Sequence, residues 1–111
     1  MELLVLGANG LVGSRMLREA LDRGLAAAGT FHTQQPDFDI EPSQLDVRNP
    51  DQFERILDRY GPDTVVNCVA MTDVDGCEEN PAKASEINGE APGVLASECN
   101  QRDIDFCHLS T

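Results

Sequence analysis

Three glycines near the start of the chain, Gly7, Gly10 and Gly13, have the spacing GxxGxxG of a phosphate-binding turn. The apolar run at residues 3–6 predicts a strand buried on both faces, and apolar residues recur at helical spacing after the glycines, up to Gly24. In such a strand–turn–helix, the missing Cβ atoms let backbone approach a pyrophosphate, which the helix N-terminus attracts. The pattern predicts a dinucleotide site. The alternative is a glycine-rich loop of an unrelated α/β protein.

The charge balance restricts the partners that the protein can have. Its 111 residues carry 20 acidic and 8 basic side chains, for a net charge of −12. A field of this sign repels phosphate, so we do not expect nucleic acid as a partner. The acidic residues are spread over the whole chain, which favours adaptation to molar salt, where a dense acidic surface stays hydrated and its self-repulsion is screened. An ordinary acidic protein is the alternative.

Length and hydropathy indicate one domain, residues 1–111. No apolar run is long enough to span a bilayer, so we expect no membrane contact. Met1 leads directly into the first predicted strand, which predicts a cytoplasmic protein without a signal peptide.

Four cysteines are present, and their spacing fits no zinc site, so we expect neither a metal site nor a disulfide. Cys68 and Cys107 lie within apolar runs and are predicted to be buried.

Strands and helices are predicted in alternation. After the first helix, strands are expected at 25–31, 44–47, 64–70 and 104–109, with helices at 50–60 and from Asn80 to about Asn100. Asn49 and Pro50 suit a helix start, and Gln52 completes a capping-box-like pair with Asn49. The alternation predicts a Rossmann-like, doubly wound parallel sheet of about five strands, incomplete, with helices on both faces.

The chain stops after the last predicted strand, at Ser110 and Thr111. We interpret this ending as a truncation that leaves out a substrate domain. An apolar strand near the sheet edge favours association, so a homodimer is one expected state.

The chain as a whole resembles the N-terminal part of the extended short-chain dehydrogenase/reductases, and more narrowly the dTDP-4-dehydrorhamnose reductase family. The resemblance is carried, in the family's order, by residues 7–13, 45–47, 65–70 and 73–78, by Asn88 with Ala91 and Pro92, and by residues 108–111.

The resemblance implies a nicotinamide cofactor, bound by residues at five places in the chain. They are Gly7, Asn9, Gly10, Leu11, Val12, Gly13, His32, Asp46, Val47, Cys68, Val69 and Ala70. Asp46 is implied as the acceptor for an adenine amino group, with a plain turn aspartate as the alternative. No Asp or Glu follows the second predicted strand to bind a ribose 2′-hydroxyl, which slightly favours NADP(H) over NAD(H). His32 is the candidate for the phosphate, and a loop histidine without a role is the alternative.

The resemblance also implies three catalytic positions. Ser110 and Thr111 match a Ser-Thr pair whose hydroxyl binds the substrate carbonyl, and Thr111 is favoured by position. Asn88 is implied to hold a water of a proton relay. Since Pro92 has no N–H, the carbonyl of residue 88 loses its helical partner, and a simple helix kink is the alternative reading. The family's YxxxK pair does not occur within the 111 residues, so we expect this chain alone to be inactive.

The function expected from the resemblance is keto reduction of a nucleotide-linked sugar, with Mg2+ as a family cofactor. Two alternatives stay open. One is a Rossmann-type regulatory or binding protein without catalysis, and the other is a sugar-nucleotide epimerase or dehydratase.

Overall fold

The computed structural model of the protein describes residues 1–8, 11–31, 43–69, 81–82 and 86–109. The elements in chain order are β1 (Leu3–Leu6), α1 (Leu11–Asp22), β2 (Ala27–Phe31), β3 (Ser43–Gln44), α2 (Pro50–Tyr60), β4 (Thr64–Asn67), the π-helix η1 (Glu86–Glu90), α5 (Ala91–Gln101) and β5 (Asp105–His108). Across these ranges, no helix is both long and apolar enough to cross a membrane.

All five strands are parallel, in the order β3-β2-β1-β4-β5. The central strand is β1, whose Leu4 lies between Ala28 of β2 and Val65 of β4. Leu4 and Leu6 pack on one face of the sheet and Val5 on the other, as the period of a strand requires. All three side chains are fully buried, which explains why this strand is apolar at every position.

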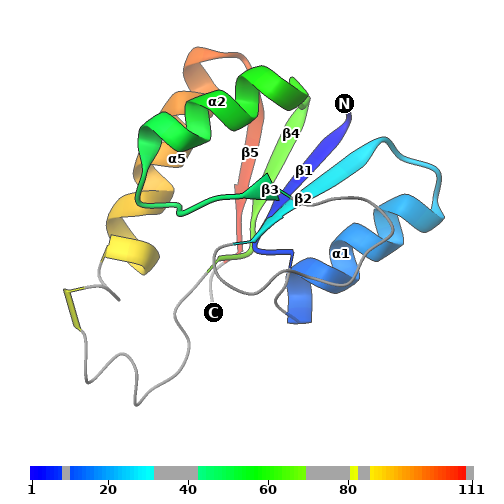
Figure 1. Cartoon of the computed structure of the whole chain (residues 1–111), viewed down its shortest axis with the longest axis horizontal. Coiled ribbons are helices and arrows are strands. Elements are labelled where there is room, and N and C mark those ends of the chain that lie inside the picture. Colours follow the sequence, from blue (N-terminus) through cyan, green and yellow to red (C-terminus); the bar gives the residue numbers. More distant parts are fainter. Residues whose placement is uncertain (9–10, 32–42, 70–80, 83–85, 110–111) are drawn as a thin grey trace.

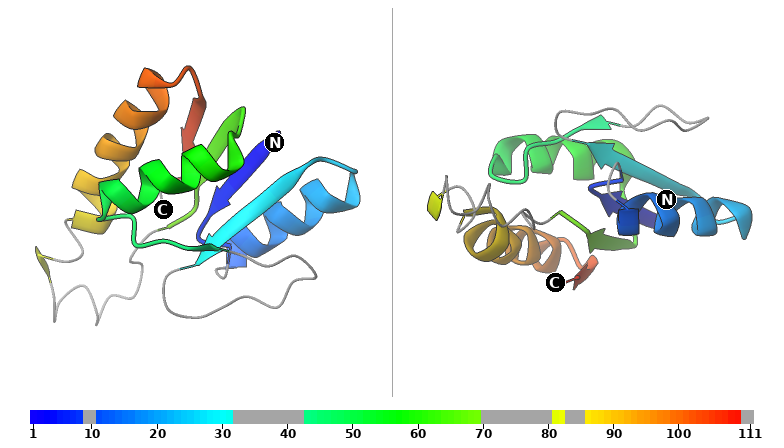
Figure 2. Two further views of the ribbon diagram at one scale, coloured as in Figure 1. Left: turned by 45° about the horizontal axis from the view of Figure 1, so that its top comes forward. Right: turned by 90° about the horizontal axis from the view of Figure 1, so that it is seen from below.

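Helices cover both faces of the sheet (Figures 1 and 2). On one face, Leu17 and Ala20 of α1 pack with Val5. On the other face, Phe53 of α2 and Leu95 of α5 belong to a larger core cluster. The predicted doubly wound parallel sheet is therefore confirmed.

The start of α2 is fixed by side chains around it. The side-chain oxygen of Asn49 accepts the backbone N–H of Gln52, as predicted. The predicted return bond differs, because Gln52 Oε1 accepts the backbone N–H of Asp46 at 2.8 Å instead of that of Asn49. The N–H of Asn49 is donated to the Asp46 carbonyl oxygen. The helix start is thus tied to the segment before it.

The end of α1 shows why β2 is shorter than the predicted 25–31. Gly24, with φ of +79°, donates its N–H to the Leu21 carbonyl, and Leu25 donates to the Ala20 carbonyl. These two bonds form a Schellman motif. Leu25 therefore belongs to the helix end, and β2 begins at Ala27.

The other bounds differ for similar local reasons. β4 ends at Asn67 because the side chain of Asn67 accepts the N–H of Val69, which turns the chain away from the strand. Ile104 donates its N–H to Cys99 at the end of α5, so β5 begins one residue later. The single helix predicted from Asn80 is replaced over residues 86–101 by η1 and α5, which differ in their helical type.

The cysteines are placed differently from the prediction. Cys107 is exposed and Cys68 is only partly buried, whereas Cys99 is fully buried in α5. Cys107 lies on β5, an edge strand of the sheet, on the face opposite that of Phe106. The helix on that face, α1, packs mainly on β1 and β2. An apolar sequence run on an edge strand therefore does not guarantee burial.

Burial of Cys99 gives the stability of the fold a pH dependence. Burial, followed by the Glu98 carboxylate, raises the pKa of this thiol from 9.0 to about 11, against an opposing effect of Arg102. Between these two values the unfolded state has lost the thiol proton and the folded state has kept it, so the free energy of unfolding falls as pH rises. We expect Cys99 to contribute a loss of about 2 kcal/mol over this range. Urea unfolding below pH 9 and near pH 11 measures this loss. The free energy of unfolding of Cys99→Ala should fall less over this range than that of the wild type. Equal losses would assign the pH dependence to other groups.

Candidate functional site: the crevice between β1 and β4

β1 and β4 pair along their whole length at the centre of the sheet, and the connections that follow them lead to opposite sides of this pair. From β1 the chain passes through α1 to β2 on one side, and from α2 it returns as β4 on the other side of β1. Strand order reverses at this point, and ligands of parallel α/β sheets bind in the crevice outside it. The glycine turn leaves β1 here, and Cys68 and Val69 follow β4.

The glycine turn brings backbone against backbone. Gly7 ends β1 with φ of +80°, a conformation that favours glycine. A Cβ on Gly13 would lie 2.1 Å from the Gly7 carbonyl oxygen, so the first turn of α1 rests directly on the turn before it. Thr30 of β2 supports the turn, because its carbonyl accepts the N–H of Ala8 at 2.8 Å and its hydroxyl accepts that of Gly7 at 3.4 Å. The absence of a Cβ on Gly13 therefore lets α1 pack closely on the turn.

On the other side of the crevice, the buried Asn67 arranges the segment that follows β4. Its Oδ1 accepts the N–H of Val69 at 3.0 Å, and its Nδ2 donates to His108 Nδ1 at 3.1 Å, which joins β4 to β5. The Val69 side chain approaches the turn so closely that a Cβ on Gly7 would lie 2.9 Å from Val69 Cγ2. Burial raises the pKa of the neighbouring Cys68 thiol, and Cys107 raises it further.

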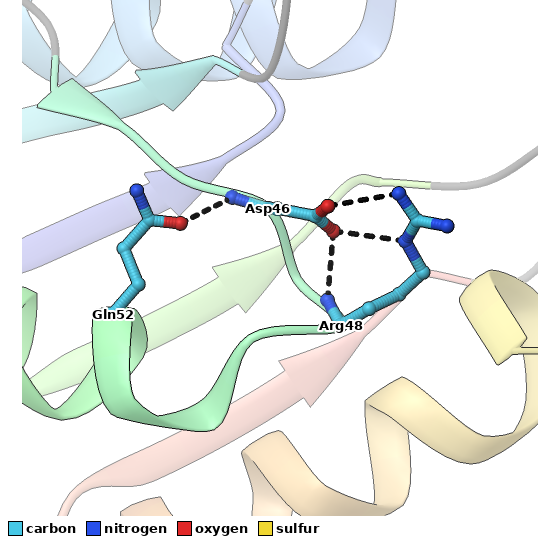
Figure 3. A network of polar contacts seen from close by, with 3 residues as sticks. All are labelled: Asp46, Arg48 and Gln52. Atoms are coloured by element: carbon cyan, nitrogen blue, oxygen red, sulfur yellow. Dashed lines mark hydrogen bonds and ion pairs between the residues drawn. The ribbon is translucent and has the colours of Figure 1, made fainter.

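Asp46 lies at the same edge of the sheet, after β3. Its carboxylate accepts three hydrogen bonds from Arg48: the backbone N–H and Nε each donate to Oδ1 at 3.0 Å, and Nη2 donates to Oδ2 at 2.8 Å. Gln52 holds the backbone N–H of Asp46 from the opposite side (Figure 3). The bonds from the backbone N–H of Arg48 to the carboxylate and from that of Asn49 to the carbonyl place Asp46 in a turn, as the alternative reading expects, and the Arg48 side chain also fixes the direction of the carboxylate.

A pocket of about 170 Å³ opens beside Asp46, between the start of α2 and the start of α5. Its walls are mainly apolar, with one cationic and one anionic side chain, and they are formed by Val47, Arg48, Pro50, Glu90, Ala91 and Val94. Val94 is 47% exposed, so its side chain is accessible to a ligand in this pocket. A flat apolar ring with a polar edge suits such a surface.

The backbone of residue 88 lies in η1, the π-helical segment immediately before α5. Pro92 occupies the first turn of α5. Because proline supplies no N–H to the preceding turn, the helix widens there, and the predicted irregularity is confirmed in the form of a π-helix. The side chain of Asn88 lies outside the described residues.

Several predicted site residues also lie outside the described part of the chain: Asn9, Gly10, His32, Ala70, Ser110 and Thr111. Of Leu11, only the place in α1 is described. Within the described ranges, no three His, Cys, Asp or Glu side chains come together as metal ligands do. These ranges therefore offer no ligand set for the Mg2+ that the resemblance implies.

Four residues with clear structural roles at the site escaped sequence reasoning: Thr30, Arg48, Gln52 and Asn67. For Asn67, a signal was present, since an amide inside the β-branched run TVVN must find hydrogen-bond partners when buried. Gln52 had been noted only as a cap. The role of Arg48 depends on side-chain geometry that its sequence position does not specify.

Comparisons with known proteins agree with this architecture. The probable low-salt glycan biosynthesis reductase Agl14 of Haloferax volcanii is 47% identical over 107 residues, which cover 96% of this chain and 36% of that protein. The dTDP-4-dehydrorhamnose reductase of Burkholderia thailandensis is 39% identical over 111 residues, 100% of this chain and 34% of that protein. The chain thus spans about a third of the length of these curated relatives.

Solved structures show the same fold. A hypothetical dTDP-4-dehydrorhamnose reductase from Sulfolobus tokodaii matches with a TM-score of 0.86 and 28% identity, over 99% of this chain and 39% of that one. The UDP-glucose 4-epimerase of Thermus thermophilus, in complex with NAD, matches with a TM-score of 0.84 and 26% identity, over 94% of this chain and 35% of that one. The family model described as RmlD substrate binding domain matches residues 1–111. The chain therefore belongs to the RmlD substrate binding domain family, in agreement with its resemblance to the dTDP-4-dehydrorhamnose reductases.

Proposed function

We propose that this chain is the part of a reductase that binds a nicotinamide dinucleotide. The observation that carries the proposal is the contact between Gly13 and the Gly7 carbonyl, at the N-terminus of α1 and at the reversal point of the sheet. A side chain at either glycine would overlap protein atoms of the turn or of the segment after β4, and so would displace the backbone N–H groups that are proposed to bind the phosphates. In the Thermus thermophilus relative with this fold, the ligand named is NAD.

In this proposal, different residues of the site bind different parts of the cofactor. The pyrophosphate lies against the turn and the first turn of α1, with Asn9, Gly10, Leu11 and Val12 contributing beside Gly7 and Gly13. The adenine lies against Val47, its amino group donating to Asp46. The segment Cys68, Val69 and Ala70 borders the ribose and phosphates on the other side of the crevice. The absence of Asp and Glu directly after the second predicted strand supports NADP(H) over NAD(H), with His32 as the candidate for the 2′-phosphate.

For the whole protein we propose reduction of a keto group on a nucleotide-linked sugar, in the cytoplasm, where such metabolites and reduced cofactors are found. A bound nicotinamide supplies the hydride. A hydroxyl of the Ser110–Thr111 pair, Thr111 by preference, binds the substrate carbonyl, and Asn88 holds a water near it. Curated relatives named as dTDP-4-dehydrorhamnose reductases support the reductase over the epimerase. Mg2+ and a homodimer belong to the proposal only through the family resemblance.

Direct titration tests the cofactor proposal. The chain contains no tryptophan, so the fluorescence of NADPH or NADH is followed without interference. We expect saturable binding to the folded chain, stronger for NADPH. A chain that is folded by circular dichroism and binds neither cofactor would contradict the proposal. A preference for NADH would leave the site intact and reject only the NADP(H) assignment.

We also propose that the protein is adapted to high salt, because a net charge of −12 on 111 residues places like charges close together. Raising KCl from about 0.1 M to about 1 M shortens the screening length from roughly 10 Å to roughly 3 Å. We expect the melting temperature to rise by roughly 10 °C, equivalent to about 2 kcal/mol. Thermal unfolding followed by circular dichroism measures this rise, which should level off as screening becomes complete. A melting temperature independent of KCl would indicate an ordinary acidic protein.

A further inference from the structure

Arg48 holds Asp46 by an arrangement that restricts the aspartate more than a simple ion pair does. The guanidinium and the carboxylate meet in a two-pronged contact, with Nε on Oδ1 and Nη2 on Oδ2, and the backbone N–H of Arg48 adds a third bond. Both side chains are 29% exposed, so solvent screens the attraction only in part. The planar fork fixes the plane of the carboxylate as well as its position.

Gln52 fixes the backbone of the same residue from the other side. It accepts the N–H of Asp46 (Figure 3). The Asp46 carbonyl in turn accepts the N–H of Asn49. Backbone and carboxylate are therefore held independently. Without the Arg48 side chain, two of the three bonds that Arg48 makes to the carboxylate would be lost. The backbone N–H of residue 48 would still donate to Oδ1, so the carboxylate would stay near its place but would be less restricted in direction.

We infer that Arg48 is a positioning residue, which aims the Asp46 carboxylate at the base of the bound dinucleotide and so makes the site selective for adenine. This inference rests on the proposed function. Arg48 also lines the pocket beside Val47, so the residue that orients the acceptor is part of the wall against which the base packs. A preorganised acceptor loses less freedom when the base binds, and it discriminates more sharply between bases.

The sharpest probe is a dinucleotide that differs from NADH only at the base edge. Reduced nicotinamide hypoxanthine dinucleotide carries a carbonyl oxygen where adenine carries the amino group, so a fixed carboxylate meets an acceptor instead of a donor. The measured quantity is the ratio of the two dissociation constants, obtained by nicotinamide fluorescence. This ratio is independent of the folded fraction, because partial unfolding lowers the apparent affinity for both ligands by the same factor. If NADPH is the tighter ligand, the 2′-phosphorylated pair is used.

We expect the wild type to prefer adenine by about tenfold or more, as for one hydrogen bond to a charged group. Arg48→Gln should reduce this preference to less than about threefold. Arg48→Lys, which keeps the charge but not the fork, should also lose most of it. The matched control is Arg23→Gln, which removes an arginine from a 2.8 Å pair with Glu19 on α1 and should leave the ratio unchanged.

Asp46→Asn separates failure of this inference from failure of the proposed function. An amide presents either a donor or an acceptor, so this variant should lose the preference whatever Arg48 does. If neither ligand binds the wild type, or if Asp46→Asn keeps the preference, the proposed cofactor site is wrong. If Asp46→Asn loses the preference while Arg48→Gln keeps or raises it, the site stands and the positioning role of Arg48 is overturned.

Discussion

Replacing Gly13 by alanine is expected to lower the free energy of unfolding by about 3 kcal/mol and to abolish cofactor binding. The added Cβ would lie 2.1 Å from the Gly7 carbonyl oxygen and 3.3 Å from Ala8 Cα. Both neighbours are backbone atoms, so no side-chain rotation relieves the overlap, and α1 must move away from β1. Such a movement opens the turn in which the phosphates are proposed to lie. Urea unfolding and NADPH titration measure the two effects.

Gly93→Ala is the matched control, because Gly93 also lies in a helix but has no heavy atom within 4 Å of an added Cβ. Alanine is the better helix former, so this variant should gain about 0.5–1 kcal/mol. The two glycine-to-alanine substitutions should thus change the free energy of unfolding in opposite directions. A Gly13→Ala variant as stable as the wild type would mean that the close approach is not required by the fold.

The fold could be predicted from the sequence where local patterns and the global arrangement agree. The apolar run of β1, the glycines after it and the Asn-Pro start of α2 each specify one local structure, and the alternation of strands and helices specifies a parallel sheet. Predictions of strand length were wrong where a helix end took part of the run. Leu25 is apolar and adjacent to a strand, yet its N–H belongs to the Schellman motif of α1.

The site was less predictable, because the residues that orient its side chains are brought together only by the fold. The glycine turn has a sequence signature, since only glycine tolerates the contact between Gly7 and Gly13. The sequence pattern around Asp46 identified this aspartate as a candidate, but it did not identify the residues that orient it. Arg48 and Gln52 both follow Asp46 closely in sequence, but only the path of the chain into α2 decides that Arg48 binds the carboxylate and Gln52 accepts the N–H. Exposure of Cys107 likewise depends on which strand lies at the edge.

Replacing Phe53 by alanine is the second prediction with a large expected effect. Phe53 is fully buried in the core cluster beneath α2, with Ile56 and Leu57 as its neighbours on the helix. Truncation of a buried phenylalanine costs about 3–5 kcal/mol, which is comparable with the whole stability of many domains of this size. We expect Phe53→Ala to be largely unfolded at low salt, as measured by circular dichroism and urea titration. Glu54→Ala, at the adjacent exposed position, should change stability by less than about 0.5 kcal/mol.

The Phe53→Ala variant also distinguishes residues that stabilise the fold from residues that determine which base is bound. Phe53 is buried in the core and anchors the turn of α2 that carries Gln52, whose side chain accepts the backbone N–H of Asp46 and does not bind its carboxylate. Where Phe53→Ala molecules remain folded, as screening by molar KCl should favour, affinity for both dinucleotides should fall together and the preference for adenine over hypoxanthine should persist. Arg48→Gln should do the reverse, with a stable fold and a lost preference. If Phe53→Ala also lost the preference while folded, the packing of α2, rather than the fork of Arg48, would be what aims Asp46.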